Sequence, residues 1–494
     1  MKNLLYIISL CGLLTACDLQ EEPYGFYSDD NFYKSETDAE SGLLYAYNAL
    51  TFLEYSRGIF YIGDIPTETM SPKSDEAGDV YQLENWIANR ETEQLQYYFK
   101  YCYIAINRAN TVIDHIQNSS GLSETARRRI LGEAYFLRAW NYFNLVRTFG
   151  IVPVQTKMVA ELSQTTPPMA TGLDQLYDLI LGDLTRADNL LEVNKVFGRA
   201  DKVAAQSLMA KAYLTIASSK EHNVHRYTEM RREPQIMYDS AAYWAGKVVR
   251  DYKNVYDFDT NLRDIYDVDK PTGPEHIFIM PIDRSGTQEG NYSKLPLLFL
   301  PSNNSVPFYI RYGNGDLQRA NGNGWGVFLC NDEFVETQFS TTDKRRTELI
   351  HRDIYDASGN PIVPNQVKGY FSSKYVDPDF IGERTSARPY LIRFSDIALV
   401  YAEAAGPEAG LAYVNRIRER AGVTPLPSGM TTDKFREAVI KERALELAFE
   451  GNRLYDLRRT ASVTTTDIKA AGLSEAEAAY YPIPQREIDL NPNL

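Results

Sequence analysis

The sequence predicts a mainly α-helical protein in which paired helices support a loop-rich region with few short strands. Two observations lead to this prediction. Apolar residues recur with helical spacing through the first half of the chain and again near its end. Between them, residues 257 to about 387 are rich in glycine, proline and asparagine. The chain is long enough for two or three ordinary domains or for one large one.

The predicted helices follow one another closely in the first half of the chain. Ser123 is a suitable N-cap for the helix that ends at Phe149, where Gly150 and Pro153 stop it. That helix is apolar on nearly all sides and is expected at the centre of the core. Antiparallel pairs suggest a tetratricopeptide-like array, although that repeat shows no clean period here. Helices are expected at residues 38–53, 91–116, 133–149, 174–191, 202–218, 239–252, 392–405, 409–421 and 432–459.

The middle region is too long to be a simple connection between helices. Its clearest β-like run is Ile277 to Met280. Irregular segments of this length are uncommon in a compact protein unless they are functional. We therefore expect this region to be laid against the helical scaffold and to carry function.

The N-terminus has the pattern of a bacterial lipoprotein signal. Lys2 precedes an apolar run from Leu4 to Leu14 that is too short to span a bilayer as a helix. Small residues then precede Cys17, so residues 1–16 are expected to be cut off and Cys17 to carry the lipid, including palmitate. The alternative is an ordinary secretory signal in which Cys17 has no role. Residues 17–36 are expected to form an acidic tether.

The composition excludes some partners. A net charge of −14 argues against nucleic acid and against anionic lipid surfaces. Cys102 and Cys330 are too few for a disulfide framework, and Cys102 is expected to be buried. Tyrosine is the outlier, with 35 residues against 21 Phe and 4 Trp. Its flat face and polar tip suit sugar-binding surfaces and interfaces, but helix packing explains most of these tyrosines.

An ordered set of segments resembles the SusD/RagB family of outer-membrane nutrient-binding lipoproteins. One such segment would be weak evidence, but the set runs in the family's order over essentially the whole mature chain. The segments are residues 103–110, 133–153, 198–200, 391–396, 401–404, 414–418, 442–459 and 481–494.

The resemblance implies the family's fold, in which tetratricopeptide-like helix pairs support an irregular ligand-binding region. Residues 37–256 would be the N-terminal helical part. Residues 257–494 would supply the loop-rich region and the C-terminal helices, packed with the first part as one globule.

The resemblance also implies a place and a function. The protein would be lipid-anchored in the cell outer membrane and would face the cell exterior. It would capture an oligosaccharide or polysaccharide and deliver it to a SusC-like TonB-dependent transporter. The alternatives are a peptide-binding member of the family, a transporter cap that binds no ligand, and a surface glycosidase.

Three clusters are candidates for the sugar-binding residues. The C–H faces of sugars lie on aromatic rings, and sugar hydroxyls bond to Asn, Asp, Arg and Gln side chains. The alternative interpretation of Trp86 is that it packs on the helix behind it. The alternative interpretation of Trp325 is a framework role among the glycines around it. The candidates are Tyr81, Asn85 and Trp86 before a long helix; Tyr292, Tyr309, Arg311 and Tyr312 in the loop-rich region; and Trp325 within residues 321–326.

No catalytic or metal-binding pattern stands out. Glycosidases need two carboxylates that flank the substrate, whereas Glu442, Glu446 and Glu450 are expected on one helix face, paired with arginines. No nucleophile elbow, HExxH or P-loop is present in the sequence. His222 and His225 lack further ligands, and residues 257–268 depart from the EF-hand pattern. We expect no catalytic residue, no cofactor and no metal.

Overall fold

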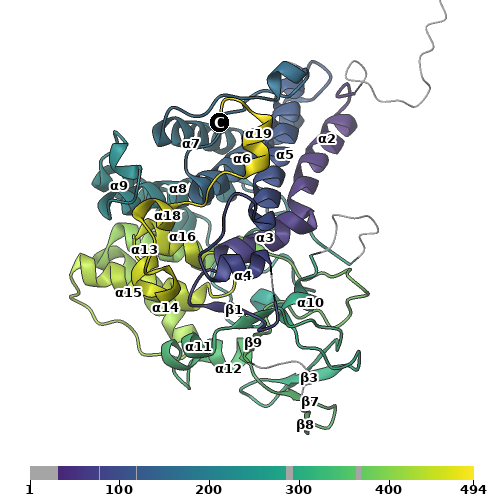
Figure 1. Cartoon of the computed structure of the whole chain (residues 1–494), viewed down its shortest axis with the longest axis vertical. Helices are drawn as coiled ribbons and strands as arrows, with labels where there is room; N and C mark the ends of the chain where they lie inside the picture. The colour runs from purple at the N-terminus through teal and green to yellow at the C-terminus, as the bar shows by residue number, and fades with distance from the viewer. Residues whose placement is uncertain (1–31, 77, 118, 285–292, 363–368) are drawn as a thin grey trace, which may run out of the picture.

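The computed structural model describes residues 32–494 except 77, 118, 285–292 and 363–368, and it is mainly helical (Figure 1). This confirms the predicted fold class. The longer helices are α2 (Glu36–Asn48), α3 (Leu53–Gly63), α5 (Glu93–Ile116), α6 (Glu124–Phe149), α7 (Leu173–Leu190), α8 (Lys202–Glu221), α9 (Pro234–Asp251), α13 (Phe394–Ala405), α14 (Pro407–Arg420) and α15 (Thr432–Glu446). The shorter ones are α4 (Asp79–Glu84), α10 (Leu295–Phe299), α11 (Asp332–Gln338), α12 (Lys344–Leu349), α16 (Arg453–Arg459), α17 (Val463–Thr466), α18 (Glu475–Ala479) and α19 (Gln485–Leu490).

Helices α5 to α9 form the array predicted for the first half of the chain, because each packs on the next. Helix α6 is buried along most of its length, as its apolar surround predicts. Its first turn is capped by Ser123, whose Oγ accepts the Ala126 N–H at 3.3 Å. Gly150 ends it with a φ of 76°, a conformation that side chains with a Cβ rarely adopt. Caps and core position were therefore both predictable from sequence.

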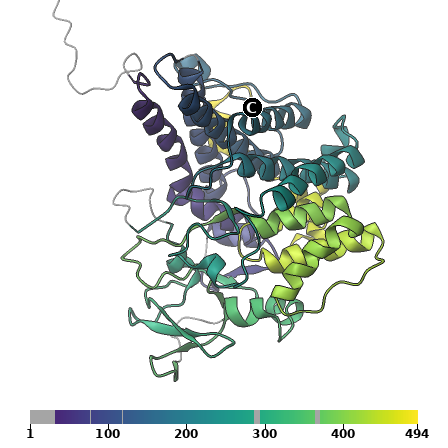
Figure 2. The same ribbon diagram turned by 180° about the vertical axis from the view of Figure 1, so that it is seen from behind.

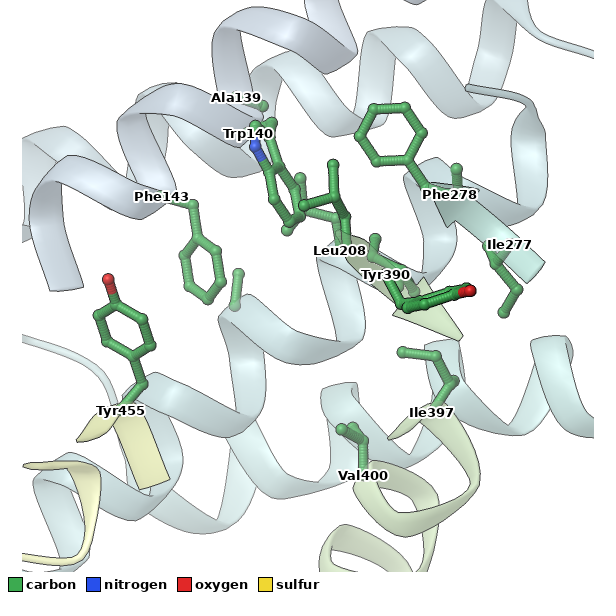
Figure 3. Close-up of a cluster of buried hydrophobic side chains, with 14 of the residues drawn as sticks. Ala139, Trp140, Phe143, Leu208, Ile277, Phe278, Tyr390, Ile397, Val400 and Tyr455 are labelled. Atoms are coloured by element: carbon green, nitrogen blue, oxygen red, sulfur yellow. The ribbon is translucent and has the colours of Figure 1, made fainter. Parts of the chain in front are cut away.

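The core joins the helical array to the second half of the chain (Figure 3). Trp140 of α6 packs edge-on against Phe278 of strand β2 (His276–Ile279), with ring centroids 5.7 Å apart. Strand β2 pairs antiparallel with β10 (Tyr390–Arg393), and α13 follows β10 directly and packs on α8 and α9. Figure 3 shows Leu208 of α8 and Val400 of α13 in the same buried cluster. Residues distant in sequence thus share one apolar core.

The strands are short and lie mostly in the loop-rich region. The four-stranded sheet has the order β4-β3-β7-β8 and lies at the end of the molecule opposite the start of α2 (Figures 1 and 2). Two further antiparallel pairs are β1–β5 and β6–β9. The remaining strand bounds are β1 (Met70–Pro72), β3 (Phe308–Arg311), β4 (Leu317–Ala320), β5 (Phe328–Cys330), β6 (Ile350–His351), β7 (Ile354–Tyr355), β8 (Pro361–Ile362) and β9 (Phe371–Ser372).

Two predicted helices were wrong because the chain turns inside them. The helix expected at 432–459 ends at Glu446, and α16 begins at Arg453. Between them Phe449 and Gly451 have φ values of 65° and 76°, and a Cβ on Gly451 would lie 2.3 Å from Cγ2 of Ile59. The segment expected at 38–53 breaks after α2, and α3 starts at Leu53. Glu450 therefore does not share a helix face with Glu442 and Glu446.

The predicted burial of these carboxylates among arginines is confirmed, with partners that the sequence did not indicate. Arg393 Nη1 donates to Glu446 Oε1 at 2.8 Å, and its Nε donates to Glu450 Oε2 at 2.8 Å. Burial by itself raises the pKa of Glu446, but Arg420, Arg393 and Arg345 outweigh burial and hold that pKa below the ordinary value. The carboxylate of Glu446 is thus charged and stabilising in the folded protein.

Replacing Glu446 with Gln is expected to lower the free energy of unfolding by about 3–5 kcal/mol at neutral pH, because it leaves buried guanidinium groups without a counter-charge. Urea denaturation measures this. Because the folded pKa is depressed, the wild-type advantage is present above the ordinary carboxyl pKa of about 4.3 and shrinks as the pH falls below it. The control is Glu437→Gln, at an exposed position on the same helix. Equal urea midpoints for the two variants would contradict the prediction.

Candidate functional site

Trp325 is held on the surface by a loop of closely packed glycines. It is 41% exposed, whereas Trp86 and Trp140 are buried and Trp244 is half-buried. Its backbone N–H donates to Leu297 O at 2.6 Å, and the Gly326 N–H donates to Leu300 O at 2.9 Å. A Cβ on Gly324 would lie 2.0 Å from Leu300 O, so only glycine allows this approach. The backbone that carries the exposed indole is therefore held in place, and we call this exposed ring the Trp325 platform.

Charged side chains border this platform. The Lys294 ammonium lies 5.7 Å from the centre of the Trp325 ring and 2.7 Å from Glu383 Oε1. The Lys73 backbone N–H donates to Val327 O at 2.9 Å, which brings the segment after β1 next to the loop. An aromatic face with donors and acceptors at its rim suits a ligand that has both apolar C–H faces and hydroxyls.

The second cluster is brought together on strand β3, but its members face different surroundings. Tyr309 is half-buried and pairs with Arg319 of β4. Arg311 is exposed, lies over the Tyr355 ring at 4.2 Å and donates to Gly359 O at 2.5 Å, so it holds the β7–β8 hairpin. Tyr312 is buried, and burial raises its pKa to about 12. Tyr292 lies outside the described residues, as does Cys17.

Tyr312 lines a polar cavity of about 640 Å³. The turn at residues 261–269 forms one part of the lining, and β4 with its preceding turn forms another. The Arg263 guanidinium lies 4.5 Å from the centre of the Tyr312 ring, and the Tyr312 hydroxyl donates to Gln318 Oε1. The sequence drew attention to residues 257–268, which overlap this turn, only as a departure from the calcium-loop pattern, and the aspartates that line the cavity were not singled out. Their spacing did not reveal that they face β4 across a cavity.

The first cluster lies at the end of α4. Tyr81 is 52% exposed, and Asn85 donates to Tyr81 O at 2.9 Å. Trp86 has a φ of 54° and is only 8% exposed, and its Nε1 donates to Asp467 Oδ2 at 3.1 Å. Its ring stacks on Tyr481 with centroids 6.2 Å apart. The ring is thus packed against the C-terminal segment, and ligand contact by Trp86 stays a prediction.

Comparison with known proteins decides the family. The profile described as "SusD family" matches residues 353–494, and the one described as "Starch-binding associating with outer membrane" matches residues 33–214. The chain belongs to the SusD/RagB family. The SusD-like protein P38 of Formosa agariphila is 26% identical, over 99% of this chain and 97% of that protein.

Solved SusD-like structures have the same fold. A SusD homolog from Bacteroides thetaiotaomicron has a TM-score of 0.76 and is 20% identical, over 94% of this chain and 97% of that chain. A laminarin-binding SusD-like protein has a TM-score of 0.74 and is 23% identical, over 93% and 98% of the two chains. At these identities the likeness establishes the architecture and leaves the ligand of this SusD-like chain to be argued from its own residues.

In the part of the chain that the structure describes, no helix is both long and apolar enough to cross a bilayer.

Gly324→Ala is expected to displace Trp325 and to destabilise the protein by about 1–3 kcal/mol, because the new methyl group meets a backbone oxygen that cannot rotate away. Thermal unfolding and acrylamide quenching of tryptophan fluorescence measure the two effects. The control is Gly472→Ala, where nothing lies within 4 Å of the new methyl group. Identical quenching and melting for both variants would show that the loop tolerates the methyl group.

Proposed function

We propose that this chain is a surface glycan-binding lipoprotein that captures an oligosaccharide or polysaccharide and delivers it to a SusC-like TonB-dependent transporter. The observation that carries the proposal is the exposed, glycine-held Trp325 with charged groups at its rim. It offers a sugar ring an apolar face and hydrogen-bonding partners at one place. Because the loop is already fixed, binding loses little conformational entropy.

The family supports a glycan as the ligand. One profile that matches this chain is named for starch binding, and one solved relative is named for laminarin binding. Delivery to a transporter requires release, so we expect micromolar or weaker dissociation constants, about −8 kcal/mol or smaller in magnitude. A peptide ligand is the alternative within the family, and the exposed indole surface favours the glycan.

The arrangement of the ends supports anchoring through Cys17. The described chain enters α2 at one end of the long axis, and strands β3, β7 and β8 lie at the other end (Figure 1). A tether of residues 17–36 would thus hold the loop-rich end away from the point where the anchored chain joins the fold. We propose the outer membrane, on its exterior side, as the location.

We also propose that the protein is not an enzyme. The carboxylates considered as catalytic candidates are buried and occupied by cations: Glu442 by Arg345 and Arg418, and Glu446 by Arg393. A carboxylate fixed in this way does not reach a glycosidic bond. The sequence did not predict a second pair of carboxylates that would flank a sugar bound at Trp325.

Affinity electrophoresis of the protein without residues 1–17 is expected to show retardation by a neutral glucan, with laminarin and starch as the first probes. Trp325→Ala is expected to weaken this binding by about 5- to 150-fold, since stacking on an aromatic ring contributes on the order of 1–3 kcal/mol. The control is Tyr243→Ala, which removes an exposed ring on α9. Retardation that survives Trp325→Ala would move the site to Tyr81 or Tyr309. If no glycan of a broad panel retards the wild type, the peptide-binding protein and the transporter cap are the hypotheses that are left.

Incubation of the same protein with laminarihexaose for a day is expected to leave the chain-length profile unchanged. Chromatography of the products measures this. The appearance of shorter oligosaccharides, absent from a boiled sample, would instead establish the glycosidase alternative.

A further inference from the structure

We propose that the polar cavity beside Tyr312 is a second sugar-binding subsite, which takes neutral sugar units of the same glycan chain that lies on Trp325. This inference rests on the proposed function and names the kind of ligand. It assigns a role to the turn at residues 261–269, which the sequence marked only as a failed metal loop.

The charges around the cavity point away from an anionic ligand. Four aspartates line it, and each lies near a cation: Arg263 contacts Asp316 at 3.1 Å, and Arg284 contacts Asp269 at 3.1 Å. Lys270 lies 2.9 Å from Asp264 and 3.6 Å from Asp267, and Arg284 also pairs with Asp377. These cations are shared between carboxylates, so the lining offers no surplus of positive charge to a uronate or a sulfate.

Paired charges of this kind still offer hydrogen bonds. A carboxylate has about four lone-pair sites and a guanidinium has five N–H donors, so one ion pair does not use them all. A hydroxyl both donates and accepts, and two neighbouring hydroxyls of a sugar can bridge a carboxylate and a guanidinium. Arg319 and Gln318 on β4 add further donors and acceptors to the lining. This is the chemistry of a polyhydroxylated, uncharged ligand.

The cavity is preformed and part of its lining is buried. Tyr266, Tyr312 and Val376 line it and are buried, and Tyr266 donates to Glu450 Oε1 at 2.8 Å. Its volume of about 640 Å³ lies within the range of about 300–1,000 Å³ that is usual for small-molecule sites. Ring carbons of a sugar can pack on these side chains while the hydroxyls bond to the charged residues of the lining.

Two chain segments connect the cavity to the Trp325 platform. The first runs from Leu317 in the lining through β4 to Trp325. The second runs from Val376 in the lining to Glu383, which pairs with Lys294 beside the indole. The first segment spans at most about 26 Å at about 3.3 Å per residue. One oligosaccharide chain can therefore reach both places, and a second contact on the same chain raises affinity without a new ligand.

The test compares short and long neutral glucans by isothermal titration calorimetry. The probes are laminaritriose with laminarihexaose and maltotriose with maltohexaose. The variant Asp269→Ala/Asp316→Ala alters two exposed positions of the lining, where ion pairs contribute little to stability. The matched control is Asp239→Ala/Asp433→Ala, at exposed positions on α9 and α15. If the lining variant has a lower melting temperature than the wild type, the isosteric Asp316→Asn variant replaces it in the titration.

The wild type is expected to bind the hexasaccharide at least about tenfold more tightly than the trisaccharide, and the lining variant is expected to lose this difference. Trp325→Ala should weaken both lengths, and carboxymethylated laminarin should bind the wild type more weakly than laminarin. Full hexasaccharide affinity in the lining variant, with loss in Trp325→Ala, would overturn the cavity subsite alone. A wild type that binds none of these glucans, nor any other neutral glycan, would overturn the proposed function together with the subsite.

Discussion

The fold depends on a group of buried charges that face one another across the centre of the second half of the chain. Arg393, at the end of β10, contacts Glu275, Glu446 and Glu450 at 2.8–2.9 Å. Arg420 at the end of α14 reaches Glu275 and Glu446 as well, and Lys374 after β9 contacts Glu450 at 2.6 Å. Helices, strands and a turn from distant parts of the sequence thus meet at one set of charges. Because each charge taken out of water is costly unless it is paired, these elements have to assemble together.

This group of charges also fixes the candidate ligand surface. Tyr266, in the lining of the polar cavity, donates to Glu450, and Lys374 adjoins Ser373, which also lines the cavity. The turn that carries Glu450 contains Gly451, whose N–H donates to Asp64 Oδ2 at 2.7 Å. Burial raises the pKa of Asp64, which follows α3 directly, to about 7. The cavity lining is therefore tied through Glu450 to the buried group of charges.

Sequence reasoning succeeded where the signal was local. Helical spacing, the Ser123 cap and the Gly150 stop are properties of a few neighbouring residues, and the structure confirms them. It failed where a distant contact decides the outcome. The turn after Glu446 exists because Gly451 packs against Ile59 of α3, and the partners of Glu446 come from segments far away in the chain. The cavity was missed for the same reason, since neither the 261–269 turn nor β4 shows its neighbour in its own sequence.

Trp86 and Trp325 show why residue type alone does not locate a ligand surface. Trp86 follows the short helix α4, and Trp325 follows a glycine-rich turn. The ring of Trp86 is nevertheless buried, whereas the ring of Trp325 is exposed. Trp86 takes a left-handed conformation in which Ile87 N–H donates to Gln82 O, and its ring is then clamped by Tyr481 and Asp467. At Trp325 the neighbouring glycines let the backbone approach Leu300 closely, and the indole is 41% exposed. A protein that must hand its ligand on benefits from the second arrangement, because an open, preformed surface captures a sugar chain without closing over it.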